Sequence, residues 1–209
     1  VSQQLAYIDR DILEFFDADV LPIHRLSPKY GIRIDEWKKG QLVDGSTALV
    51  PKGFCPIKEG REYKIINEKG QTLAKRSESS LYYDSVGVYH PLADAETTDE
   101  IRNSFPNEEI SEEEEKYLED KAKKYRDETD YALMSSFGGS LYEAGQNLRG
   151  YKQWYMDLAG NEKIVNQILD LLLDQHLKNL KAFIEIMGDK IDIVVFGGDD
   201  LGMQDGPQI

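Results

Sequence analysis

Cysteine is almost absent from this sequence, because Cys55 is the only one among 209 residues. A disulfide within the chain is therefore excluded, and this usage is typical of a reducing compartment, so we expect a cytoplasmic protein. Histidine is also scarce, with three residues, and their spacing relative to Cys55 forms no metal-ligand motif. We therefore expect this chain to hold no metal site of its own.

Basic residues are few relative to acidic ones: 25 Lys and Arg stand against 39 Asp and Glu, which gives a net charge of −14. A nucleic-acid-binding protein needs a basic surface, and an anionic membrane repels an acidic chain. No apolar run approaches the ~20 residues of a membrane-spanning helix, and the first residues lack a signal-peptide pattern. We expect neither nucleic acid nor a membrane as a partner.

The residues that are present indicate a substantial core, since 40% of the chain is hydrophobic. Near the start, apolar residues recur at three- and four-residue spacings: Leu5, Ile8, Ile12, Leu13 and Phe16. This spacing predicts an amphipathic helix. Because the sequence begins inside this pattern and without Met, we interpret it as an internal fragment of a longer protein.

Three short apolar runs, over residues 17–23, 130–137 and 191–196, are typical of buried strands. Helical patterns separate them, and the longest covers about residues 161–187. Nearly continuous apolar strands that alternate with helices predict parallel strands covered by helices. The fold class expected from this order is α/β.

Two capping boxes mark predicted helix starts. Ser111 and Glu114 open a helix that should run to about Glu128, and Ser140 and Glu143 open a shorter one. The acidic run over residues 112–115 is best explained as a solvated first turn that complements the helix dipole.

Residues 27–105 differ from the rest, because Gly and Pro recur and the apolar runs are shorter. Alternating residues on both sides of Asn67 and Gly70 predict a β-hairpin, with Gly70 at the position that requires positive φ. We interpret residues 27–105 as a β-rich, hairpin-containing insertion into one domain that spans residues 1–209.

Polar residues follow all three predicted strands: His24 and Arg25 after the first, Ser140 with Gly138 and Gly139 after the second, and the aspartate pair at 199–200 after the third. Because the carboxyl ends of parallel strands lie at one edge of a sheet, we expect a functional site there. An aspartate of the 199–200 pair could bind a hard cation, orient a substrate or exchange a proton. The structural alternative is that one of them caps a helix or turn.

Residues 135–180, SSFGGSLYEAGQNLRGYKQWYMDLAGNEKIVNQILDLLLDQHLKNL, and 192–209, DIVVFGGDDLGMQDGPQI, resemble the uroporphyrinogen decarboxylase superfamily. The earlier pieces VSQQLAYIDRDIL, VLPIHRLSP, DGSTALVPKGF and GQTLAKR are similar to its corrinoid-dependent methyltransferases of the O-demethylase type. This resemblance implies a (β/α)8 barrel, of which this chain would supply only a part. Such barrels need about 250 residues.

The resemblance also implies a cleft at the barrel mouth, lined by positions that match Gly138, Gly139, Asp200 and Gln204. The expected substrate-binding residues are Gly138, Gly139, Asp199 and Gln204. Asp200 is the expected catalytic residue. The residue at 199 is its alternative, because relatives often carry one glycine before the aspartates where this chain has two. His24 is a second catalytic candidate as a general acid, although a lone histidine is more often structural.

The implied reaction moves a methyl group from a small donor, such as a phenyl methyl ether, to a corrinoid carried by a partner protein. Such transfer uses zinc as a Lewis acid, and its ligands would have to lie outside this chain. Two alternatives stay open: uroporphyrinogen decarboxylation, and a non-catalytic module that binds a corrinoid protein. Decarboxylation is disfavoured because the Arg-Gln-Ala-Gly-Arg-Tyr motif is missing and His24 stands where decarboxylases carry an Asp.

The remaining candidates have structural explanations. His176 lies on the apolar stripe of the long helix, Ser140 is explained by its capping box rather than as a nucleophile, and Cys55 is expected to be a small buried residue. Four aromatic residues could cover a flat substrate or pack within the insertion: Phe54, Tyr82, Tyr83 and Tyr89. A partial barrel would also expose strand edges, so self-association is expected.

Overall fold

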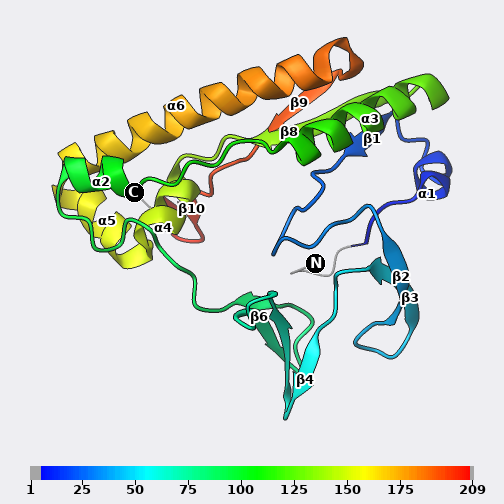
Figure 1. Ribbon diagram of the computed structural model, residues 1–209, viewed down its shortest axis with the longest axis horizontal. Coiled ribbons are helices and arrows are strands. Elements are labelled where there is room, and N and C mark those ends of the chain that lie inside the picture. The colour runs from blue at the N-terminus through cyan, green and yellow to red at the C-terminus, as the bar shows by residue number, and fades with distance from the viewer. Residues whose placement is uncertain (1–5, 208–209) are drawn as a thin grey trace. The chain divides into compact units, whose positions relative to one another are not determined.

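The computed structural model describes residues 6–207 and is a mixed α/β protein (Figure 1). Its described part divides into two compact units. The first comprises residues 6–19 and His24–Val88, and the second comprises Val20–Ile23 and 89–207. No sheet within residues 6–207 closes into a barrel. The α/β class is therefore confirmed, and the partial barrel stays a prediction.

The first unit is rich in antiparallel strands, as predicted for the insertion. The β2–β3 hairpin stands apart from a four-stranded sheet with the order β4-β5-β6-β7. The elements are α1 (Arg10–Phe15), β2 (Trp37–Gln41), β3 (Thr47–Pro51), β4 (Ile57–Glu59), β5 (Glu62–Ile66), β6 (Thr72–Ser77) and β7 (Asp84–Ser85).

The predicted hairpin is confirmed as β5 and β6. Its turn is fixed by Asn67, whose Oδ1 accepts hydrogen bonds from the backbone N–H groups of Lys69 (3.0 Å) and Gln71 (2.9 Å). Gly70 has a φ of +75°, which a residue with a Cβ adopts only with strain. The local sequence therefore determines this turn.

The core of the first unit contains Ile65, Ala74 and Tyr83. The ring of Phe54 lies edge-on to Tyr83, with the centroids 5.9 Å apart. These two aromatic residues therefore pack within the unit, whereas Tyr82 is exposed.

The first helix differs from its prediction. It begins only at Arg10, and among its apolar residues only Leu13 is buried, while Ile12 and Phe16 are exposed. Leu5 lies outside the described residues. The spacing indicated a helix correctly, but it did not identify which side chains are covered.

The second unit contains a parallel sheet with the order β1-β8-β9. This confirms the three predicted strands and their direction. The elements are β1 (Val20–Ile23), α2 (Thr98–Ser104), α3 (Glu112–Glu128), β8 (Ala132–Gly138), α4 (Tyr142–Arg149), α5 (Tyr151–Gly160), α6 (Glu162–Met187), the 3-10 helix η1 (Gly188–Lys190), β9 (Ile193–Phe196), β10 (Gly202–Met203) and β11 (Gly206–Pro207).

Helices α3 and α6 lie along the parallel sheet (Figure 1). Phe183 of α6 is fully buried, and its ring lies 6.0 Å from that of Phe137 on β8. Within the sheet, Leu21 pairs with Leu133, and both are buried. The predicted start of α3 is confirmed, since the Ser111 side chain accepts a hydrogen bond from the backbone of Glu114.

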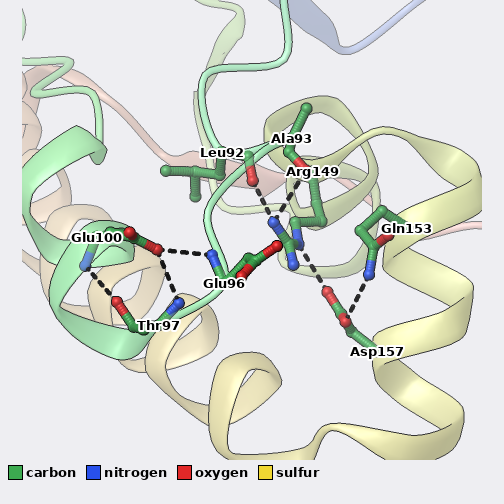
Figure 2. Close-up of polar contacts among 8 residues, drawn as sticks. All are labelled: Leu92, Ala93, Glu96, Thr97, Glu100, Arg149, Gln153 and Asp157. Carbon is green, nitrogen blue, oxygen red and sulfur yellow. Dashed lines mark hydrogen bonds and ion pairs between the residues drawn. The ribbon is translucent and has the colours of Figure 1, made fainter.

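A buried ion pair joins the short helices of this unit (Figure 2). Arg149 donates from Nε to Oδ2 of Asp157 at 2.6 Å, and the two side chains are only 4% and 3% exposed. The same guanidinium donates to the carbonyl oxygens of Leu92 and Ala93, while Gln153 donates to the second oxygen of Asp157. These contacts hold the segment before α2 against α4 and α5.

Helix α2 is an element that the sequence reading missed. Thr97 and Glu100 form a complete capping box at its start (Figure 2). The signal was present as Thr-x-x-Glu, inside the region interpreted as an insertion. This helix packs with α6 in the second unit, and the first unit ends at Val88.

Candidate functional site

The loops that follow β8 and β9 meet at the carboxyl edge of the parallel sheet. Gly138 pairs with Phe196, and the N–H of Gly197 donates to the carbonyl oxygen of Gly138 at 2.8 Å. Gly138 and Gly139 have φ values of +111° and +105°. A Cβ on Gly139 would lie 3.0 Å from the ring of Phe196. The paired glycines therefore permit the close approach of the two loops.

Asp199 caps α4 across a long sequence separation. Its Oδ1 accepts hydrogen bonds from the hydroxyl of Ser140 (2.5 Å) and the N–H of Glu143 (3.0 Å). Its Oδ2 accepts from the N–H of Leu141 (3.1 Å). The carboxylate therefore satisfies N–H groups that a helix start leaves without an intrahelical partner. This matches the structural alternative considered for the aspartate pair.

The capping box predicted for Ser140 and Glu143 is wrong. The residue that precedes the helix is Leu141, which makes no side-chain cap, and the hydroxyl of Ser140 is a donor to Asp199. The tertiary carboxylate replaces the local cap because it accepts several hydrogen bonds at once. The lowered pKa of Asp199 makes this carboxylate a poor general base, so the contact does not activate the Ser140 hydroxyl as a nucleophile.

The pKa of Asp199 reflects two opposing effects. Partial burial raises the pKa, but hydrogen bonds from the backbone of Glu143, the hydroxyl of Ser140 and the backbone of residues 141–142 outweigh it. The net result is a pKa below the usual value of 3.8. Asp199 is therefore held as a charged acceptor.

Asp200 has a different environment. It is exposed, and its Oδ1 accepts one hydrogen bond, from the N–H of Gly202 at 3.3 Å. The pKa of the nearby Tyr142 is raised to about 12, mainly because that side chain is buried and hydrogen-bonds to the hydroxyl of Tyr155. The negative charge of Asp200 makes a smaller contribution in the same direction. Asp200 therefore presents an accessible carboxylate that can orient a polar ligand.

Gln204 lies in the two-residue turn between β10 and β11, and it is exposed. Its place in the turn explains its backbone conformation, and the residue is exposed to solvent.

The three histidines occupy different settings. Nε2 of His176 lies 2.8 Å from the carbonyl oxygen of Ser140, so its ring supports the loop that Asp199 holds. Nδ1 of His90 lies 2.6 Å from the carbonyl oxygen of Asn147. His24 belongs to the first unit, where its ring lies edge-on to Tyr7 with the centroids 5.3 Å apart, and desolvation lowers its pKa from 6.5.

The prediction for Cys55 is wrong, because the residue is exposed rather than buried. Its Sγ lies 2.8 Å from Nζ of Lys38 on the neighbouring hairpin. Its neighbours Phe54 and Pro56 suggested that Cys55 would be buried. The fold of the first unit instead leaves this position at the surface.

The side chains present do not fit a zinc ion. Within residues 6–207, no group of three or more His, Cys, Asp and Glu side chains is placed to hold a metal. The same part of the chain contains no helix with the length and apolar character that crossing a membrane requires.

The first unit also carries an open cavity of about 610 Å³ between the turn at Tyr30, the turn after β3 and the β5–β6 hairpin. Arg33 and Asp35 on its wall form an ion pair, as do Glu36 and Lys52. None of the site residues predicted from the sequence lines it.

Comparison of the chain with models of protein families, with curated proteins and with solved structures found no match.

Proposed function

We propose that this chain is part of a cytoplasmic corrinoid-dependent methyltransferase with a (β/α)8 barrel. Its substrate would be a small methylated molecule, such as a phenyl methyl ether. The order β1-β8-β9, in which three parallel strands are adjacent in the order of the chain, supports the barrel. Successive strands of a (β/α)8 barrel have this arrangement, and its sites lie at the carboxyl ends of the strands. The methyl transfer itself is proposed from the sequence resemblance.

The surface of the sheet supports the barrel. Among the described residues, β9 is an edge strand, and its Ile193 and Val195 are exposed. Parallel sheets are normally covered on both faces, and an apolar edge strand favours pairing. Ile193 and Val195 are two positions apart and so share one face of the sheet, which further elements of a barrel would cover.

In this proposal Asp200 is the residue that contacts the methyl donor, because its carboxylate is exposed at the strand ends. Asp199 is a positioning residue, since its oxygens are occupied at the start of α4. Gly138 leaves space for the donor, because a Cβ there would meet nothing within 4 Å. His24 is proposed because it follows a strand beside Arg25, and Gln204 is proposed on the sequence resemblance.

The corrinoid of the partner protein supplies the methyl acceptor. What this chain contributes is a hydrogen-bond acceptor at Asp200 for a hydroxyl group of a methoxylated phenol, and a loop, held by Asp199, that places this acceptor. The described side chains form no ligand set for zinc.

The decisive experiment supplies the complete protein with a reduced corrinoid protein and a methoxylated phenol. We expect release of the free phenol together with a change in the corrinoid absorption spectrum. Asp200→Asn should lower the rate at least tenfold, whereas Lys152→Gln, an exposed charge change on α5, should leave it unchanged. Release of carbon dioxide from uroporphyrinogen instead would identify the decarboxylase alternative, and binding of the corrinoid protein without either product would identify a non-catalytic module.

A further inference from the structure

The surface of α1 carries an unusual apolar patch in the first unit. Phe15 and Phe16 are 79% and 72% exposed, and their rings lie edge-on with the centroids 5.1 Å apart. Ile8 and Ile12 extend the patch and are about half exposed. An exposed apolar patch with a polar rim is a common feature of interaction sites on soluble proteins.

The charge around this patch has one sign. Residues 6–19 contain five carboxylates and one basic residue, Arg10. All five carboxylates are exposed: Asp9, Asp11, Glu14, Asp17 and Asp19. The patch is therefore apolar at its centre and acidic around it, which is the usual arrangement of a binding surface with a polar rim.

The negative charge around the patch indicates which kind of partner could bind there. A second copy of the chain would bring the same carboxylates together, and like charges at an interface disfavour binding. An anionic membrane surface would be repelled for the same reason. A protein surface with an apolar groove bordered by Lys and Arg would bury the Phe rings and pair with the carboxylates.

We infer that the patch of Ile8, Ile12, Phe15 and Phe16 is a docking surface for a partner protein that presents a basic, amphipathic face. The aromatic pair is the anchor, since buried aromatic side chains dominate the energy of protein interfaces. The carboxylates increase the association rate and give the interaction its salt dependence. This inference is independent of methyl transfer.

The test uses the full chain and a labelled synthetic helix of leucine and lysine, with the leucines on one face. A second peptide of the same composition, with the leucines spread around the helix, is the control for simple charge attraction. Fluorescence anisotropy in about 0.1 M salt, where screening acts over about 10 Å, measures binding. We expect the amphipathic peptide to bind at least tenfold more tightly than its control.

Two variants separate the contribution of the Phe rings from that of the carboxylates. Phe15→Ser with Phe16→Ser keeps the net charge and should weaken binding at least tenfold, whereas Leu49→Ser, at a 65% exposed position of β3, should change it less than twofold. Asp11→Asn with Glu14→Gln should weaken binding less and reduce its salt dependence.

Three outcomes would overturn the inference. Equal binding of the peptide by the Phe15/Phe16 variant would show that the patch is not the contact. Equal binding of the amphipathic peptide and its control would show that charge attraction alone accounts for the binding. Dimers of the wild-type chain that disappear in the Phe15/Phe16 variant, measured by analytical ultracentrifugation, would identify a second copy as the occupant.

Discussion

Ser140 donates a hydrogen bond of 2.5 Å to Oδ1 of Asp199, 59 residues later in the chain. This bond joins the loop after β8 to the loop after β9. It also gives the two adjacent aspartates different environments. Asp199 binds the start of α4, while Asp200 is exposed. The two residues are equivalent in sequence and differ only in what the fold places beside them.

Removal of the Asp199 carboxylate should destabilise the protein. Asp199→Ala leaves the first N–H groups of α4 without their acceptor, so we expect the free energy of unfolding to fall by about 1–2 kcal/mol. Asp200→Ala is the matched control and should have little effect, because that carboxylate accepts one long hydrogen bond. Urea denaturation measures both. A loss at Asp200 as large as at Asp199 would contradict the assignment of the cap.

Asp199 should also contribute to acid sensitivity. Its pKa is lowered in the folded state, so its stabilisation is complete above the unfolded value of about 3.9 and is lost as pH falls through the folded pKa. We therefore expect the stability difference between the wild type and Asp199→Asn to shrink below about pH 4. Denaturation curves from pH 7 to pH 3 test this, and a pH-independent difference would argue against a charged cap.

The buried pair of Arg149 and Asp157 should be sensitive to the loss of either partner. Arg149→Leu or Asp157→Leu alone leaves an uncompensated buried charge, with an expected cost of about 3–5 kcal/mol. The double variant should cost less than the sum of the two, because no charge is left unpaired. Loss of the exposed pair Lys181–Glu185 by Glu185→Gln should be within error. Strict additivity of the two buried substitutions would refute the pairing.

The β5–β6 turn should favour glycine at position 70. Gly70→Ala forces a Cβ into a φ of +75° and should cost about 1 kcal/mol. Gly53→Ala in the same unit is the control, since its Cβ would make an ordinary contact of 3.8 Å with Ile32. Thermal unfolding compares them, and an equal change in both would mean that φ at residue 70 does not limit stability.

Local signals predicted much of the secondary structure. The cap at Ser111 and the Asn67–Gly70 turn depend on residues within a few positions, so the sequence alone located them. The capping box at Ser140 was misassigned because its pattern is also local, whereas the true acceptor, Asp199, is brought there by the pairing of β8 with β9. The exposure of Phe16 and Cys55 was missed for a related reason: apolar character predicts burial only if another element covers the residue.

The sequence by itself determined the α/β class, the three apolar strands, their polar ends and an acidic surface, since each depends on composition or short-range periodicity. Only the tertiary structure decided that β1, β8 and β9 are neighbours in this order, that Asp199 rather than Ser140 caps α4, and that Asp200 stays exposed. These features arise from hydrogen bonds and packing between residues far apart in the chain, and no local pattern encodes which distant groups meet.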